Sequence, residues 1–134
     1  MATEDLTAED RELLRGKNYA HFVTLNPDGS PHATPLWIDV DDEGFVLVNT
    51  AVGRRKDRNV RRDSRVALSL HEQDDPYRWL SVNGIVTGFV GEPDALRHIA
   101  ALARRYDDRE WVPVPGQERV IYRIRPDRVR RGDA

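Results

Sequence analysis

A run of basic residues between two apolar segments is the part of this sequence most suited to chemistry. The stretch NTAVGRRKDRNVRRD, residues 49–63, follows the apolar run FVLV and precedes VALSL. Seven of the twelve residues from Arg54 to Arg65 are basic, a third of the 21 lysines and arginines in a chain of net charge −2. Such a cluster either forms a solvated face or binds an anion.

The spacing within this segment suits a phosphate group. A strand is expected to end near Thr50 and a helix to begin near Gly53, and helix N-termini carry unpaired N–H groups with partial positive charge. Gly53 lets a ligand approach the backbone, while Arg54 and Lys56 add a forked guanidinium and a point charge. From the residues alone, a solvated face with local aspartate pairs stays open as the alternative.

Other catalytic candidates are weaker, and the sequence singles out no catalytic residue. The four histidines lack the spacing of a metal site, so no metal is expected, and there is no cysteine to act as nucleophile or ligand. Trp37, Tyr77 and Trp79 are of a type that belongs more often to a core than to a wall for a flat ligand. A protein that holds a reactive cofactor fits better than an acid–base enzyme.

The bulk composition bounds the protein class. A chain of 134 residues suggests one domain, residues 1–134, and the slightly negative net charge argues against a nucleic-acid partner. No apolar stretch approaches the roughly 18 residues needed to span a bilayer, and the acidic start MATEDLTAEDRELL does not resemble a signal peptide. A cytoplasmic protein without a membrane partner is expected.

The hydrophobic pattern predicts a mainly β fold with short helices (α+β). Pro31 and Pro35 indicate an edge strand, and Gly84 and Gly88 indicate a bend of the kind found in closed barrels. The polar tail 126–134 is expected to fray. The strands are predicted over residues 19–26, 31–40, 45–50, 65–72, 78–91 and 119–125, the first three as an antiparallel meander. The helices are predicted over about 7–16, 53–62 and 93–106.

Three segments together resemble a known superfamily. The hairpin LNPDGSPHATPLW, the basic stretch NTAVGRRKDRNVRRDSRVALSL and the segment DPYRWLSVNGIV are similar to the pyridoxamine 5′-phosphate oxidase-like superfamily, and more narrowly to its F420-dependent flavin/deazaflavin oxidoreductases. The resemblance covers about residues 7–125, and its most specific element is R-x-K-x-x-N-x-x-x-D at Arg54, Lys56, Asn59 and Asp63. It implies a split β-barrel like that of FMN-binding proteins, and a homodimer with cofactor sites at the interface.

The resemblance also implies a set of site residues. Arg54 and Lys56 would bind the cofactor phosphate, Thr50 and Ala51 would lie beside it, and Asn59 would order the loop. The second strand would line the cofactor ring, and the YRW segment would come from the partner subunit. The expected cofactor-binding residues are His32, Ala33, Pro35, Trp37, Thr50, Ala51, Gly53, Arg54, Arg55, Lys56, Asn59, Tyr77, Arg78 and Trp79.

The resemblance implies hydride transfer between coenzyme F420 and an unsaturated or conjugated small organic molecule. FMN stays the alternative because it too carries a tricyclic ring, a ribityl chain and a phosphate. Coenzyme F420 adds an anionic oligoglutamate tail, which Arg55, Arg58, Arg61 and Arg62 would meet electrostatically, and the arginine-rich composition resembles actinobacterial proteins, in which this coenzyme is common. A non-catalytic protein that binds or stores a flavin, coenzyme F420 or a haem-derived ligand is the remaining alternative.

Overall fold

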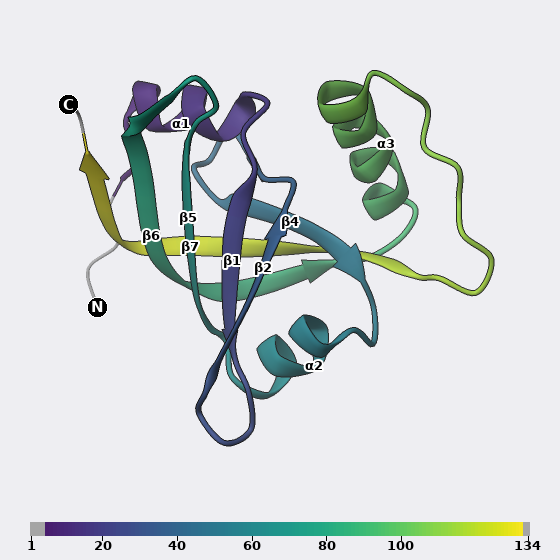
Figure 1. The fold of residues 1–134 in the computed structure, drawn as a ribbon. Helices are drawn as coiled ribbons and strands as arrows, with labels where there is room; N and C mark the ends of the chain where they lie inside the picture. Colours follow the sequence, from purple (N-terminus) through teal and green to yellow (C-terminus); the bar gives the residue numbers. More distant parts are fainter. Residues whose placement is uncertain (1–4, 133–134) are drawn as a thin grey trace.

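The computed structural model of this protein describes residues 5–132, and within that range it contains one seven-stranded antiparallel sheet and three helices (Figure 1). The spatial order of the strands is β2-β1-β5-β6-β7-β4-β3. The edge strands β2 and β3 are consecutive along the chain, so the sheet curls round into a partly closed barrel. The elements are α1 (Ala8–Arg15), β1 (Ala20–Leu25), β2 (Pro31–Leu36), β3 (Asp39–Val40), β4 (Val46–Ala51), α2 (Arg55–Arg62), β5 (Arg65–Glu72), β6 (Asp75–Val90), α3 (Asp94–Asp107) and β7 (Arg119–Gly132).

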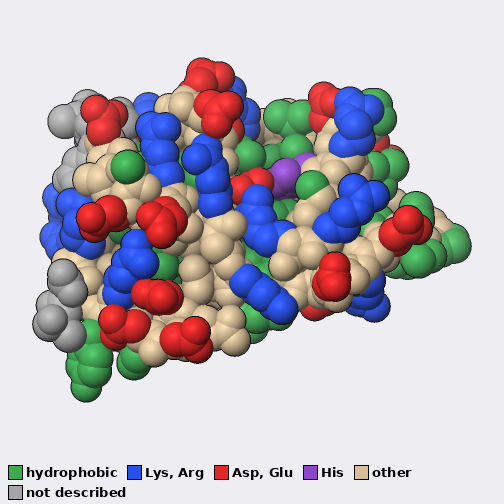
Figure 2. Space-filling view, turned by 90° about the horizontal axis from the view of Figure 1, so that it is seen from above, with side chains coloured by type: hydrophobic (Ala, Val, Ile, Leu, Met, Phe, Trp, Pro, Cys, Tyr) green, Lys and Arg blue, Asp and Glu red, His purple; other side chains and the backbone are tan. Residues whose placement is uncertain are grey.

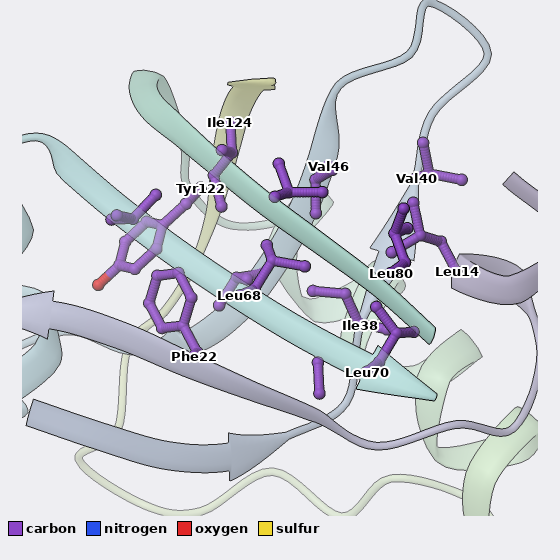
Figure 3. Packing of buried hydrophobic residues seen from close by; sticks show 14 of the residues in the cluster. Leu14, Phe22, Ile38, Val40, Val46, Leu68, Leu70, Leu80, Tyr122 and Ile124 are labelled. Atoms are coloured by element: carbon purple, nitrogen blue, oxygen red, sulfur yellow. The ribbon is translucent and has the colours of Figure 1, made fainter. Parts of the chain in front are cut away.

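The mainly β split barrel with short helices is confirmed, and its interior is one apolar core (Figure 3). Alternate residues of the strands point inward, as the period of two requires. Helices α1 and α2 lie at opposite ends of the barrel (Figure 1), where Leu14 of α1 and Val60 of α2 join the core. Full burial of each such side chain contributes about 1.5–3 kcal/mol. Side chains of this core include Leu14, Phe22, Ile38, Val46, Leu68, Leu80, Tyr122 and Ile124.

The predicted strand 31–40 is divided in the structure. Residues 31–36 pair with β1, and Asp39 and Val40 pair with β4. Between them, the Ile38 backbone N–H donates to the Tyr106 hydroxyl of α3 (3.1 Å), and that hydroxyl donates to the Asn18 carbonyl (2.7 Å). The expected meander is therefore wrong as a continuous ladder, because a side chain of α3 holds the backbone where the middle strand turns.

The C-terminal segment is ordered further than its composition suggested. Strand β7 continues to Gly132, and its C-terminal part, residues 126–132, pairs with residues 79–84 of β6. The expectation of fraying is therefore wrong for residues 126–132, and residues 133–134 lie outside the described range. Val129 points into the core at 7% exposure. The guanidinium of Arg131 binds the buried Asp10 carboxylate of α1 (2.7 Å). These long-range partners outweigh the polar character of the tail.

Strand β6 bends at the two glycines that the sequence singled out. The pairing register between β6 and β7 shifts at Gly84 and again before Gly88. A Cβ atom at Gly84 would lie 2.5 Å from the Arg125 carbonyl oxygen, whereas one at Gly88 would meet nothing closer than 3.9 Å. Of these two glycines, only Gly84 is therefore needed for the close approach of the β6 and β7 backbones.

Helix α3 lies outside the barrel (Figure 1) and forms a second, smaller apolar cluster. Its Ile99, Leu102 and Tyr106 side chains pack against Trp37 and Trp111. This cluster positions the 108–118 connection beside the barrel. No helix within residues 5–132 has the length and apolar character needed to cross a membrane.

Candidate functional site

The basic segment turns at Gly53 and enters α2. Gly53 has φ +93°, a left-handed conformation that favours glycine, and a Cβ atom there would meet nothing within 4 Å. Arg54 is the N-cap and Arg55 the first helical residue. The predicted helix start is therefore confirmed to within two residues, and the backbone at Gly53 is open to approach.

A buried carboxylate that sequence reasoning missed holds this turn together. Asp57, at 1% exposure, accepts hydrogen bonds from the Gly53 N–H (2.9 Å), the Tyr122 hydroxyl (2.7 Å) and Arg61 Nε (3.1 Å). Burial, together with the bond to this carboxylate, raises the pKa of Tyr122 far above its ordinary value. The Gly53 N–H is thus used internally and is not a free donor. The sequence feature that could have identified Asp57 is its position as an acidic residue in the first turn of a predicted helix, where a carboxylate can accept a hydrogen bond from the preceding backbone.

Asn59 braces α2 against the first hairpin. Its side-chain amide, at 2% residue exposure, donates to Thr24 Oγ1 (3.0 Å) and to Asn26 Oδ1 (3.1 Å). Asp63 ends the helix and binds Arg65 (2.7 Å), whose hydrogen bonds lower the pKa of Asp63 to about 2. These contacts agree with an ordering role for both residues of the R-x-K-x-x-N-x-x-x-D pattern.

Three cations, Arg54, Lys56 and Arg119, gather near the start of α2, where Glu92 acts on Arg119 only from a distance. Burial, with the charges of Arg54 and Arg119, lowers the pKa of Lys56, and burial, with the charge of Arg54, lowers the pKa of Arg119 to about 10. Among residues 5–132, no carboxylate lies within 4.0 Å of the charged nitrogens of these three side chains. An anion bound between them would relieve this repulsion.

Arg119 is a site residue that sequence reasoning missed. It opens β7 opposite Ala51, the last residue of β4, and is only 5% exposed. Its Nε donates to Asn49 Oδ1 (3.0 Å), and its guanidinium carbon lies 5.2 Å from the centre of the Trp111 ring. The sequence held no signal for it, because the chain contains many arginines and only the β4–β7 pairing brings this one to the site.

Arg54, Asn49 and Arg119 help to line a groove of about 310 Å³ between the barrel and α3, and Lys56 is not among its lining residues. Of the residues predicted from the sequence, it includes Pro35, Trp37 and Arg54. Trp37 also stacks on Tyr106, with ring centres 5.3 Å apart and planes 9° apart, so it serves both the small cluster and the groove wall. The lining residues are Tyr19, Pro35, Leu36, Trp37, Asn49, Arg54, Ile99, Trp111 and Arg119.

Several predicted residues lie away from this groove. His32 and Ala33 lie toward the hairpin turn, opposite Thr24 and Val23 of β1. The YRW segment, residues 77–79, lies near the start of β6, at the opposite end of that strand from the residues that approach α2 (Figure 1). Within one chain these residues do not join the site, and their contribution from a partner subunit stays a prediction.

The arginines expected to meet an acidic tail divide into two pairs. Arg61 binds Asp57 and lies over the Phe89 ring (4.5 Å), and Arg62 donates to the Leu25 carbonyl oxygen. These two are used within the fold. Arg55 and Arg58 are exposed and form no ion pair with any other described residue, so they alone of the four remain available to a ligand.

Two buried polar atoms of the site region are left without a partner. Three buried side-chain atoms within residues 5–132 have no hydrogen-bond partner, and of these Thr50 Oγ1 and Trp111 Nε1 belong to this region, while Thr34 Oγ1 lies on β2. Such an unsatisfied group calls for an explanation, for example a bound water or ligand. Together with the three cations, the two atoms of this region fit a ligand that carries a phosphate and a flat ring. Residues 5–132 contain no group of three histidine or acidic side chains placed to hold a metal ion.

Comparison with known proteins identifies relatives of the whole chain. A structure described as an F420 reductase is 32% identical, with a TM-score of 0.78, and the match covers 90% of this chain and 94% of that one. A conserved hypothetical protein from Mycobacterium tuberculosis is 28% identical, with a TM-score of 0.76 and coverage of 98% and 86%.

A protein named as a reductase is also similar in sequence. The 5a,11a-dehydrotetracycline/5a,11a-dehydrooxytetracycline reductase of Streptomyces rimosus subsp. rimosus is 26% identical over 132 residues, which cover 92% of this chain and 80% of that protein. The pyridoxamine 5′-phosphate oxidase family matches residues 6–131. The resemblance seen in the hairpin, the basic segment and the YRW segment is thereby confirmed, and the chain belongs to the pyridoxamine 5′-phosphate oxidase family.

Proposed function

We propose that this protein is an oxidoreductase that binds coenzyme F420 beside α2 and transfers hydride between it and an unsaturated or conjugated small organic molecule. The observation that carries the proposal is an aromatic-walled groove lined by Arg54 and Arg119. The charge of Lys56 lies close enough to both to be affected by them, and none of the three forms an ion pair with a described carboxylate. The similarity to an F420 reductase and to a dehydrotetracycline reductase supports the same class of reaction.

Each group of the site has a binding or orienting role in this proposal. Arg54 and Lys56 hold the cofactor phosphate as a fork and a point charge. The rings of Trp37 and Trp111 flank the groove, exclude water and restrict the tilt of a planar ligand. The bound deazaflavin supplies the hydride chemistry. Solvent or a nearby hydroxyl, such as that of Tyr19 in the groove lining, is the expected source of any proton.

Coenzyme F420 is preferred to FMN for a specific reason. Arg55 and Arg58 project from α2 without ion pairs among the described residues, and they would attract an anionic oligoglutamate tail, which FMN lacks. Acidic and basic side chains are mixed on the face above α1 and α3 (Figure 2). In α2, by contrast, basic residues outnumber acidic ones, and an anionic ligand would account for that excess.

Parallel titrations test the proposal. We expect colourless purified protein to bind coenzyme F420 at least tenfold more tightly than FMN, followed by oxidation of the reduced coenzyme with one or more members of a panel of conjugated ketones. Protein that purifies yellow, with bound flavin, would transfer the proposal to FMN. Tight binding without oxidation across the panel would replace catalysis by a storage role.

A further inference from the structure

We propose that Arg119 is a further anion-binding residue of the groove, which contacts a phosphate or carboxylate oxygen of the ligand, and that Asn49 and His98 are positioning residues that keep its guanidinium aimed. The identity of the ligand rests on the proposed function, whereas the anion contact itself does not.

The guanidinium of Arg119 has donors to spare in a buried place. An arginine side chain carries five N–H donors, and two hydrogen bonds to described residues use them here, to Asn49 Oδ1 (3.0 Å) and to Gln117 Oε1 (3.0 Å). The Glu92 carboxylate binds the Arg119 backbone N–H (2.8 Å) and lies beyond ion-pair distance of the guanidinium. Glu92 attracts this buried cation only from a distance, and a buried charge without a close counter-ion is costly, so an anionic ligand oxygen in direct contact is the partner that this arrangement lacks.

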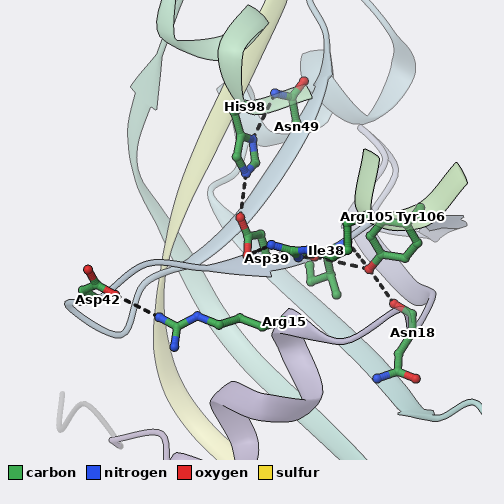
Figure 4. A network of polar contacts seen from close by, with 9 residues as sticks. All are labelled: Arg15, Asn18, Ile38, Asp39, Asp42, Asn49, His98, Arg105 and Tyr106. Atoms are coloured by element: carbon green, nitrogen blue, oxygen red, sulfur yellow. Dashed lines mark hydrogen bonds and ion pairs between the residues drawn. The ribbon is translucent and has the colours of Figure 1, made fainter. Parts of the chain in front are cut away.

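The orientation of Asn49 is fixed by its neighbours on α3. Its Nδ2 donates to the Ala95 carbonyl oxygen (2.9 Å) and lies 3.1 Å from His98 Nδ1, so its Oδ1 faces Arg119. Because Nδ1 of His98 accepts, its Nε2–H donates to Asp39 Oδ2 (2.9 Å). Figure 4 shows His98 between Asn49 and Asp39. One assignment of protons satisfies the whole series of hydrogen bonds that runs from Asp39 of β3 through His98 and Asn49 to Arg119 in the groove.

Because Asn49 is a neutral amide, it binds the Arg119 guanidinium without neutralising its positive charge, which stays available to an anionic ligand. A carboxylate at that position would hold the guanidinium equally well but would also neutralise it. At the other end of this series of hydrogen bonds, Asp39 forms an ion pair with Arg105 (3.0 Å). The negative charge that orients His98 is therefore already balanced by Arg105. The hydrogen bonds from Asp39 through His98 and Asn49 thus orient Arg119 without placing a carboxylate against its guanidinium.

Binding of inorganic phosphate, measured by calorimetry, tests the contact without reference to redox chemistry. We expect Arg119→Gln to weaken phosphate binding by about tenfold or more, as loss of a charge-assisted contact does, with Arg119→Lys intermediate because it keeps the charge without the fork. The exposed control Arg128→Gln should bind as the wild type does. Equal affinity in Arg119→Gln, Arg119→Lys and wild type would overturn the proposal.

A pair of variants at His98 tests the positioning role. The amide of glutamine presents an acceptor and a donor much as the imidazole does, so His98→Gln should retain phosphate affinity, whereas His98→Leu should lose several-fold. If both variants bind phosphate as wild type does, whatever their thermal stability, His98 is only structural and that part of the proposal fails.

Flavin analogues separate the two sources of the anion. If Arg119 contacts the cofactor phosphate, Arg119→Gln weakens binding of FMN or coenzyme F420 but not of riboflavin or a deazaflavin without phosphate. If it contacts a substrate carboxylate, the loss appears in the KM of carboxylate-bearing substrates alone. Retained phosphate binding in a protein that shows no cofactor turnover would reject the proposed function and leave this inference standing.

Discussion

Asp57 is the residue on which the geometry of the basic segment depends. Its buried carboxylate receives the Gly53 N–H, the Tyr122 hydroxyl and Arg61. Removing one member of such a network leaves several buried donors unpaired. We expect Asp57→Ala to lower the free energy of unfolding by about 3 kcal/mol, measured by urea denaturation. The fully exposed Asp42, paired with Arg15, is the control, and a similar loss in Asp42→Ala would contradict this account.

The pKa values of two other aspartates, Asp10 and Asp39, allow a prediction of how the stability of the protein depends on pH. Burial alone would raise the pKa of Asp10 and Asp39, but hydrogen bonds and charge from Arg131 at Asp10, and from His98 and Arg105 at Asp39, lower both below the ordinary 3.8. A lowered pKa in the folded state contributes stability above pH 3.8 that is lost as the pH falls through the folded-state value. The denaturant concentration at the unfolding midpoint should therefore decrease as the pH is lowered below about 4. Asp10→Asn should flatten that decline, and an unchanged slope would argue against the ion pair.

At the residue scale, the sequence revealed what lies close together in the chain. Arg54, Lys56 and Asn59 stand in one short pattern, and their segment could be read as an anion site. Asn49 and Arg119 could not be linked, because the two meet only through the pairing of β4 with β7. The hydrogen bond between Asn49 and Arg119 can be inferred only once that register is known.

At the scale of elements, the bend of β6 is the feature most open to test. A Cβ atom at Gly84 would strike the backbone oxygen of Arg125 at 2.5 Å, whereas Gly88 has room. We expect Gly84→Ala to lower the free energy of unfolding by about 1–3 kcal/mol and Gly88→Ala to have little effect. Chemical denaturation of both variants checks this, and equal stabilities would show that the strand adjusts freely.

Elements built from alternating apolar residues could be predicted, and those held by distant partners could not. Strands β1, β4 and β5 follow their hydrophobic pattern. The turn between β2 and β3 depends on Tyr106 of α3, and the end of β7 depends on β6. In both places the local sequence is polar or proline-rich, and tertiary pairing decides the structure.

For the whole molecule, the open question is whether two chains complete the site. Tyr77 and Trp79 are 66% and 40% exposed at the end of β6 distant from the groove of their own chain, and we propose that they cover the groove of a second copy. Sedimentation should give a mass twice the 15.4 kDa of one chain, with Trp79→Glu monomeric and weaker in cofactor binding. Arg104→Glu on the surface of α3 is the control. A monomeric wild type that binds cofactor fully would reject the shared site.

The fold class followed from the sequence because six strand patterns with short helices admit few architectures. The position of the groove did not, because it lies between the barrel and α3, and no local pattern encodes their packing.

Fluorescence titration with coenzyme F420 is the most direct test of the cofactor site. The measurement compares wild type, the Arg54→Ala/Lys56→Ala double variant and the Arg128→Ala control. Two charge-assisted contacts of about 1.5–3 kcal/mol each predict a loss of at least 100-fold in affinity for the double variant, with the control unchanged. Coenzyme binding that is equally tight in all three proteins would contradict the assignment of the phosphate to the start of α2.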